Sequence, residues 1–240
     1  MANGPKPLIL LKLTGELFAT PKLAPTAQHS QLVVDLIAQI KQLRATHQFA
    51  FVMGGGNFFR GNQHGKAFQL QASTAHQVGL LATVMNSLIL QDLFAQHGLP
   101  ATVLSAIECP QIAAAISTPN IQTALHQQHC LIFAGGTGEP FFSTDTAAVL
   151  RALQIKAQVV WKATNVDGIF TADPRTNAQA QLLSHLSYQE ALAQRLQILD
   201  QTALILAREH ALPIRVFNLF TPQALWRAAH DQNFGSLLSA

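Results

Sequence analysis

Short apolar runs that alternate with longer amphipathic segments set the tightest limit on what this chain can fold into. Continuous apolar runs bounded by Gly, Pro or polar residues predict strands: Leu8–Leu13, Ala50–Met53, Ala101–Leu104, Cys130–Ala134, Gln158–Lys162 and Pro213–Phe217. Segments of helical periodicity predict helices: Ser30–Ala45, Ala75–His97, Ile121–Gln128, Asp145–Leu153, Ser187–Ala193, Asp200–His210 and Pro222–His230. Because parallel strands need crossover connections, this alternation predicts an α/β fold: a mainly parallel central sheet with helices on both faces, in a three-layer sandwich.

Composition makes one packed domain the simplest organisation. Of the 240 residues, 49% are hydrophobic and 11% are charged, against a usual charged share of about 25%. This composition argues against intrinsic disorder, and a chain of this length needs no disulfide or metal to support its core. No repeat, low-complexity tract or Pro/Ser-rich linker divides the chain, so we expect one domain over residues 1–240, with a ligand beyond the carboxyl ends of the strands.

Charge and hydropathy exclude several kinds of partner. The longest apolar stretch, Val78–Leu90, is interrupted by polar residues and glycine, and it falls short of the roughly 20 residues that a membrane span needs. Leu8–Leu11 is too short for a signal peptide. Lys and Arg exceed the acids by 15 to 12 without forming a run, which argues against a nucleic-acid partner. Cys109 and Cys130 lack the spacing of a zinc site or disulfide framework. We expect a soluble cytoplasmic protein whose uncovered apolar surface forms homo-oligomer contacts.

The first predicted strand ends in Lys12-Leu13-Thr14-Gly15-Glu16. A lysine followed by a hydroxyl and a glycine suits a phosphate, because the ammonium supplies charge and the glycine admits oxygens close to the backbone. A solvated turn lysine is the alternative, and taken alone the pattern favours it.

The second strand runs into Gly54-Gly55-Gly56-Asn57-Phe58-Phe59-Arg60-Gly61. A sharp turn needs one glycine rather than three, so the triplet favours backbone N–H groups that approach an anion, with Arg60 as a planar clamp on phosphate oxygens. Phe59 occupies the place of the third glycine of a dinucleotide fingerprint, and Gly65-Lys66 lacks the remainder of a Walker A loop.

The fourth strand leads into a loop that enters a helix at Ser143-Thr144-Asp145. Any of these three side chains can cap the helix, whose N-terminus favours an anion. Phe141 and Phe142 could present a flat apolar surface to a base or could pack in the core, and the residues leave both interpretations open.

Lys162 opens a further cluster that runs to Pro174 and contains Asp-Gly and Asp-Pro turn signals. It adds a second cation at a strand end. Cations on both sides of a transferred phosphoryl group match a loose transition state with spread charge. Together with Lys12, Arg60 and the acid Asp145, Lys162 therefore suggests phosphoryl transfer.

As a set, these motifs resemble those of the bacterial uridylate kinases (UMP kinases), members of the amino acid kinase family. The similarity spans nearly the whole chain through KLTGE, GGGNFFRG, GLLATVMN, GGTGEPFFSTDTAA, KATNVDGIFTADP, the ILD at Ile198–Asp200, and PIRVFN. The resemblance implies transfer of the γ-phosphoryl of ATP to UMP with Mg²⁺ in pyrimidine nucleotide biosynthesis. It also implies a homohexamer whose chains have an N-terminal phosphate-acceptor lobe and a C-terminal ATP-binding lobe.

Site residues follow from matching positions, and none is expected to ligate a metal. The resemblance implies a catalytic set of Lys12, Arg60, Asp145 and Lys162, with Asp145 orienting the lysines. It implies UMP contacts from Gly55, His76, Thr137, Gly138, Glu139, Pro140, Phe141, Phe142, Ser143 and Thr144. It implies ATP contacts from Lys12, Leu13, Thr14, Gly15, Gly56, Arg60, Thr164, Phe170 and Asp173.

The sequence departs from the family pattern at a few positions. His76 stands where these kinases place an aspartate that contacts the ribose; it could bond a ribose hydroxyl or fill a surface position. Leu8 replaces an arginine, and Leu17–His29 lacks the glycine-rich segment associated with GTP regulation. A kinase of the same fold with another acceptor is disfavoured by Pro140–Phe142. A non-catalytic nucleotide-binding or oxyanion-storage protein of this fold is the alternative from another functional class.

Overall fold

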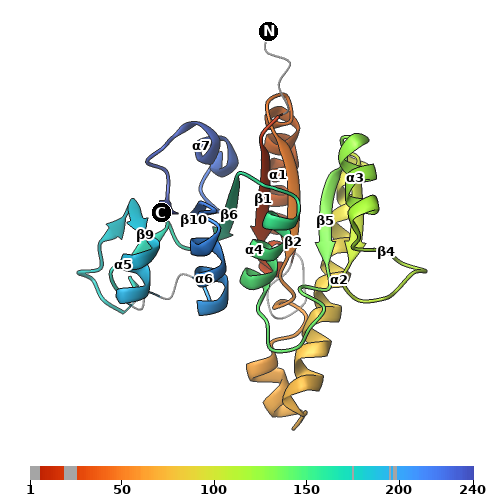
Figure 1. Cartoon of the computed structure of the whole chain (residues 1–240), viewed down its shortest axis with the longest axis horizontal. Coiled ribbons are helices and arrows are strands. Elements are labelled where there is room, and N and C mark those ends of the chain that lie inside the picture. Colours follow the sequence, from red (N-terminus) through yellow and green to blue (C-terminus); the bar gives the residue numbers. More distant parts are fainter. Residues whose placement is uncertain (1–5, 19–25, 175, 195, 197–198) are drawn as a thin grey trace.

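A central sheet organises the computed structural model, which describes residues 6–18, 26–174, 176–194, 196 and 199–240. Within those residues the sheet has nine strands in the order β4-β3-β5-β2-β1-β6-β10-β11-β9 (Figure 1). Neighbours pair in parallel except β10 and β11, which confirms the mainly parallel α/β prediction. The strands are β1 (Leu8–Leu13), β2 (Gln48–Met53), β3 (Ala101–Ser105), β4 (Ala114–Ala115), β5 (Cys130–Ala134), β6 (Val159–Thr164), β9 (His185–Ser187), β10 (Ile214–Asn218) and β11 (Ser236–Ser239).

Helices occupy all the segments for which periodicity predicts them. They are α1 (Ala27–Leu43), α2 (Ala72–Gln96), α3 (Thr118–His126), α4 (Thr144–Gln154), α5 (Tyr188–Ala193), α6 (Gln201–Glu209) and α7 (Ala224–His230). A 3-10 turn, η1 (Gly15–Leu17), follows β1, and a π-helical turn, η2 (Gly61–Gly65), precedes α2. A separate antiparallel pair joins β7 (Ile169–Phe170) to β8 (Leu182–Leu183).

Alternate residues of β1 point to opposite faces of the sheet and build two cores. Leu11 and Leu13 pack in a cluster with α1, α2 and α7, whereas Leu8 and Leu10 pack in a cluster with α3, α4 and α6. Helices therefore cover both faces, as the near-continuous apolar strands predict.

Helix α2 is long and apolar enough to cross a membrane by length and composition, although its apolar run is interrupted in the sequence. One side, which includes Leu90 and Phe94, is fully buried in the core. Its other side exposes Leu81, Met85 and Ile89 at 53%, 48% and 36%, spaced four residues apart on one face. The helix is thus a core helix with one unpartnered apolar stripe.

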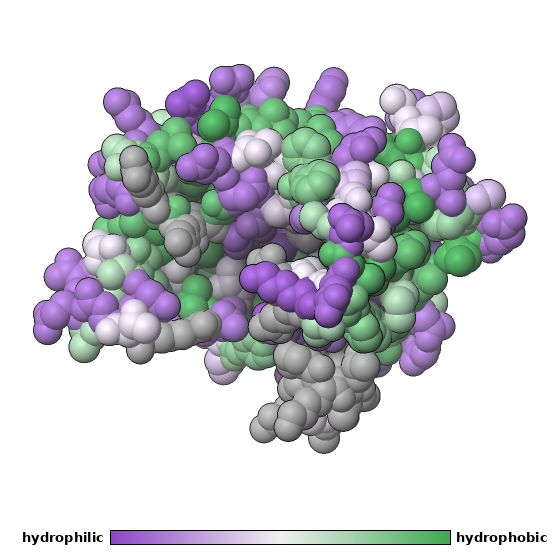
Figure 2. All heavy atoms as spheres, turned by 90° about the horizontal axis from the view of Figure 1, so that it is seen from below, coloured by the Kyte–Doolittle hydropathy of each residue, from purple (hydrophilic) through white to green (hydrophobic). Residues whose placement is uncertain are grey.

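The carboxyl ends of the parallel strands gather the loops that carry the sequence motifs. Lys12 of β1 is in register with Lys162 of β6 and with Val52 of β2. The segments that follow β1, β2, β5 and β6 therefore leave the sheet at the same edge, which lies at the bottom of Figure 1. Seen from below, this side presents hydrophobic side chains between hydrophilic ones (Figure 2).

Candidate active site

Two lysines and one aspartate meet at this edge. Lys12 and Lys162 are register partners on adjacent parallel strands, so their side chains leave the same face of the sheet. Asp145, in the first turn of α4, lies between them: its Oδ1 is 3.4 Å from Lys12 Nζ and its Oδ2 is 2.6 Å from Lys162 Nζ. Two like charges side by side repel, and the carboxylate offsets this repulsion.

Burial and pairing set the protonation of this group. Each of the three side chains is 14% to 17% exposed. Burial alone would raise the pKa of Asp145, but attraction to Lys12 and Lys162 outweighs it and holds the pKa of the carboxyl below its usual range. Burial lowers the pKa of the Lys162 ammonium, and Asp145 offsets part of that effect. Asp145 is therefore ionised at neutral pH.

Asp200, the residue that precedes α6, holds the first turn of α4 in place through hydrogen bonds. Its carboxylate caps α6 by accepting from the Ala203 N–H at 2.9 Å, and it also accepts from the hydroxyl of Thr146 at 2.9 Å and from that of Ser143. Ser143 in turn caps α4 by accepting from the Asp145 N–H. The helix turn that presents Asp145 is thus tied to a second helix, because both begin at hydrogen-bonded caps.

Within the glycine triplet, one residue packs closely against a helix and another leaves space for a ligand. A Cβ at Gly55 would come within 2.8 Å of the Gly79 carbonyl oxygen of α2, so this glycine is required by contact with the helix. Packing against α2 therefore accounts for one of the three glycines, for which the sequence pattern indicates only an approach to an anion. Gly54 and Gly56 have room for a Cβ, and none of the three has a left-handed backbone. The space beside Gly56 remains open to a ligand.

A buried amide pair joins the first two loops to α2. Asn57 and Asn86 are 1% and 0% exposed and exchange hydrogen bonds of 3.2 and 2.7 Å. Asn86 also donates to the Gly54 carbonyl at 2.6 Å. A Cβ on Gly15 would collide with this pair at 2.1 Å, which explains the glycine after Lys12 without reference to a ligand. Buried amides with all partners met make the loops rigid.

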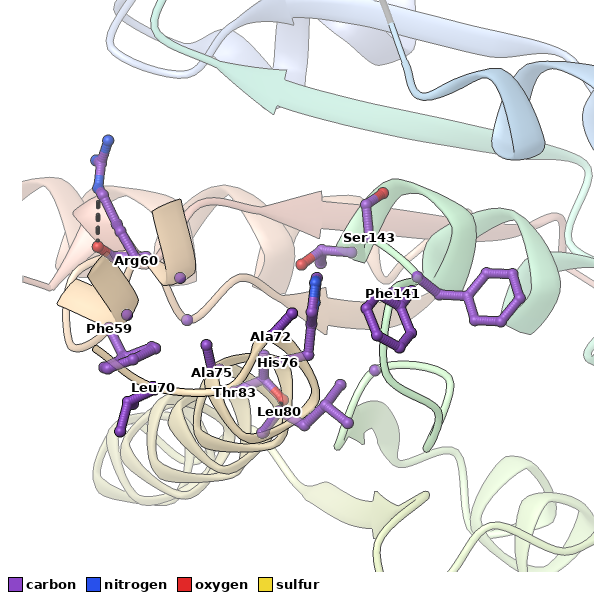
Figure 3. Close-up of a pocket in the computed structure, with 18 of the residues that line it drawn as sticks. Phe59, Arg60, Leu70, Ala72, Ala75, His76, Leu80, Thr83, Phe141 and Ser143 are labelled. Atoms are coloured by element: carbon purple, nitrogen blue, oxygen red, sulfur yellow. Dashed lines mark hydrogen bonds between the residues drawn. The ribbon is translucent and has the colours of Figure 1, made fainter. Parts of the chain in front are cut away.

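Arg60 is held in two ways. Its Nε donates to the Gly56 carbonyl at 3.0 Å (Figure 3), and its Nη2 forms an ion pair with Glu16. Its remaining terminal nitrogen, Nη1, has no partner among the described residues. The guanidinium therefore keeps one face for an anion, as its planar fork allows.

A cleft of about 970 Å³, within the size range of small-molecule sites, is lined by Ser143 and Thr144, which directly precede Asp145. Lys12, Asp145 and Lys162 themselves are not among its lining residues. Figure 3 shows it between the second loop, α2 and the loop that precedes α4. The predicted site residues that line it are Gly55, Gly56, Arg60, His76, Phe141, Phe142, Ser143 and Thr144. Arg60, Lys66 and His76 line it with no carboxylate among the lining residues, so the cleft suits an anion.

His76 and Phe141 meet across this cleft. Their ring centroids are 4.8 Å apart (Figure 3). Phe141 and Phe142 are 68% and 45% exposed, so core packing does not account for these two rings. Phe141 also has a left-handed backbone with φ of 71°, which is rare for an aromatic residue and common at ligand sites.

Other predicted residues lie outside this cleft. Thr137, Gly138, Glu139 and Pro140 belong to the same loop as Phe141 but do not line it. The Leu13 side chain is in the core, so only its backbone is available to a ligand. Beyond the lysine pair, Thr164 ends β6, Phe170 lies in β7 and Asp173 lies in the turn that follows. Ile198 lies outside the described residues.

Sequence reasoning missed four of the residues that build this site. Glu16, Asn86, Thr146 and Arg151 hold other site residues in place. Asn86 had a signal, because an amide within an apolar helix needs a buried partner. The other three had none, because their partners are far away in the sequence.

Comparisons with known proteins agree with this fold and site. The family model described as the amino acid kinase family matches residues 7–218. A protein named uridylate kinase from Coxiella burnetii is 42% identical over 245 residues, which cover 99% of this chain and 98% of that protein. The crystal structure of UMP kinase from Ureaplasma parvum has 30% identity, covers 99% of this chain and 100% of its own, and has a TM-score of 0.92. UMP kinase from Bacillus anthracis has 29% identity, coverage of 98% and 97%, and a TM-score of 0.90.

A parallel sheet that brings two lysines and an aspartate to its carboxyl edge suits the class of α/β enzymes that transfer phosphoryl groups. Within that class, the chain belongs to the amino acid kinase family. The similarity to uridylate kinases predicted from the motifs is confirmed over nearly the full length.

Proposed function

We propose that this protein is an ATP-dependent UMP kinase, which transfers the γ-phosphoryl of ATP to UMP and yields UDP and ADP in cytoplasmic pyrimidine nucleotide biosynthesis. The observation that carries this proposal is the placement of Lys12 and Lys162 on either side of Asp145, which directly follows Ser143 and Thr144, two lining residues of a cleft without lining carboxylates. The 42% identity to a uridylate kinase supports UMP as the acceptor.

The two substrates would approach the lysines from different lobes. UMP would occupy the cleft, in contact with Gly55, His76 and the lining residues 141–144, whose exposed phenylalanines offer a surface to its base. The motif resemblance alone adds residues 137–140 of the same loop as contacts. ATP would lie beyond β6, where Thr164, Phe170 and Asp173 are found. Lys12–Gly15, Gly56 and Arg60 would face the phosphates of both.

The charges of the site suit a loose transition state. Asp145 offsets one of the two lysine charges and fixes both ammonium groups, so one net positive charge remains for the transferring group. The attacking atom is a phosphate oxygen of UMP, which is already anionic and needs no general base. Positioning and electrostatic stabilisation then supply the catalysis.

Mg²⁺ would be held mainly by the phosphates of ATP. The described residues contain no group of three or more His, Cys, Asp or Glu side chains that could hold a metal, and Asp145 is engaged by both lysines. This fits the usual Mg²⁺ site, which relies on substrate phosphates and water. When bound, the ion would neutralise phosphate charge; the lysines and Arg60 act on the same oxygens from the protein side.

The exposed stripe of Leu81, Met85 and Ile89 on α2 supports a homo-oligomer, because an apolar helix face of this kind is typical of a subunit interface. The homohexamer is proposed from the motif resemblance.

Coupled measurement of ADP release tests the function. UMP is expected to give the highest kcat/KM in a series with CMP and the purine nucleoside monophosphates. Absence of turnover with every monophosphate would overturn the proposal. ATP binding by calorimetry in the absence of phosphoryl transfer would favour the non-catalytic nucleotide-binding or storage protein instead.

A further inference from the structure

Arg151, in the last turns of α4, is a buried cation with no carboxylate partner among the residues that the structure describes. It is 8% exposed. Its Nη2 donates to the carbonyls of Gly136 and Thr137 at 3.3 and 3.5 Å, and its Nη1 donates to the Gln154 side chain at 2.9 Å. Burial lowers the pKa of the guanidinium, but an arginine side chain stays protonated in proteins. Within the described residues, the buried guanidinium charge is thus stabilised by hydrogen bonds to backbone carbonyls and not by an ion pair.

The loop that receives these bonds has an unusual backbone. Gly135, Gly136 and Gly138 have φ values of 74°, 58° and 91°, and the non-glycine Phe141 has 71°. Left-handed backbone of this kind persists where the surrounding contacts over-determine it. Thr83 of α2 fixes one end of the loop by accepting from the Gly135 N–H at 2.9 Å. Arg151 fixes the following two peptide units from the opposite helix.

The geometry of the peptide unit determines which way the N–H next to the anchored carbonyl points. In a trans peptide unit the N–H points away from the C=O, so the bond from Arg151 to the Gly136 carbonyl turns the Thr137 N–H away from the guanidinium. That N–H has no protein partner among the described residues. A cation on the carbonyl also polarises the peptide and strengthens its N–H as a donor.

From this geometry we infer that Arg151 is a positioning residue for the acceptor: it presents the loop of residues 135–142 to the monophosphate and thereby sets the affinity for UMP. The inference rests on the proposed function for the identity of the acceptor. Arg151 does not reach the lysine pair through any hydrogen bond or ion pair of the described residues, so its effect should fall on the acceptor rather than on ATP.

Steady-state kinetics of Arg151→Met separate this role from a general structural one. We expect the KM for UMP to rise about tenfold or more, since hydrogen bonds from a charged donor are lost, while kcat and the KM for ATP change less than about threefold. Arg151→Lys, which retains the charge and can reach one carbonyl, should recover part of the UMP affinity and remains informative if Arg151→Met does not fold. Gln154→Leu is the matched control, because it removes the other guanidinium partner and leaves the loop untouched.

Hydrogen exchange supplies a readout that does not depend on activity. The hydrogen-bonded amides of the loop, those of Gly135, Gly138 and Glu139, should exchange faster in Arg151→Met than in the parent protein, while those of β6 stay protected. If UMP is not a substrate, the kinetic arm fails in the parent protein itself and the exchange arm still tests the anchor. Unchanged loop exchange, or equal increases in the KM values for UMP and ATP, would overturn the inference.

Discussion

The two edges of the sheet both gather cations, yet they use them differently. At the carboxyl edge, Lys12, Lys162 and Arg60 pair with carboxylates. At the amino edge, a smaller cavity of about 340 Å³ is lined by Lys6, Lys41 and Arg44, and no ion pair involves these three among the described residues.

The amino-edge cations bind helix ends instead. Lys6 Nζ donates to the Arg44 carbonyl at 2.6 Å and Lys41 Nζ to the His97 carbonyl at 3.0 Å, while Arg44 donates to the Gln128 carbonyl. These carbonyls follow the last turns of α1, α2 and α3, where helix ends carry partial negative charge and unpaired acceptors. Cations at the amino edge thus satisfy carbonyls at helix ends. At the carboxyl edge, Asp145 holds the two lysines and Glu16 holds Arg60 where an anion can bind.

The largest expected effect is at the carboxyl edge. Asp145→Asn removes the charge that holds two adjacent lysines, and we expect kcat to fall about 10²- to 10³-fold, in the range of lost electrostatic preorganisation. The measurement is the coupled ADP assay with circular dichroism to confirm folding. Asp35→Asn, the same change on exposed α1, is the control. Near-normal kcat in Asp145→Asn would show that the ion pairs at the carboxyl edge matter no more for catalysis than the hydrogen bonds at the amino edge.

A smaller effect is expected from pH. Burial holds the pKa of Lys162 below its ordinary value, which is about 10.4 for a free lysine. The active form is the ammonium, so kcat/KM, which reports the free enzyme, falls as pH rises through this lowered pKa, and its alkaline limb should lie below about pH 10.4. Folding has the opposite dependence: the unfolded chain binds the proton more tightly, so this lysine adds stability as pH rises through the same range. A kcat/KM profile that stays flat to about pH 10.4 would contradict this account.

The smallest effect is expected at the amino edge. Lys41→Met removes a cation from the carboxyl end of α2, and we expect a loss of about 0.3–1 kcal/mol in the free energy of unfolding with kcat unchanged. Urea denaturation and the ADP assay measure the two quantities. A fall in kcat as large as that of Asp145→Asn would show that the amino edge takes part in function.

The strands differ in how well the sequence predicts them. The six predicted strands are long, apolar and buried on both faces, so their own residues specify them. By contrast, β4, β7, β8, β9 and β11 are two to four residues long and form because a partner strand lies beside them. No local pattern could reveal those strands.

In the candidate site, too, local sequence predicts some features, and others depend on neighbouring elements. Lys12 and Lys162 each stand out at a strand end, but their shared register depends on β6 lying next to β1, and strand order is not a local property. The exposed state of Phe141 and Phe142 likewise excludes the core packing that the sequence leaves open. Arg151 carries no local signal, because its bonds to the loop go to backbone carbonyls, which every residue type supplies.

The two exposed phenylalanines also have a thermodynamic consequence. Aromatic side chains bury large apolar areas when covered, and removal of apolar surface from water lowers the heat capacity. A ligand that covers Phe141 and Phe142, which are 68% and 45% exposed, should therefore bind with a negative heat-capacity change. Its binding enthalpy will become more favourable on warming, so calorimetry at several temperatures reports directly on whether the rings are covered.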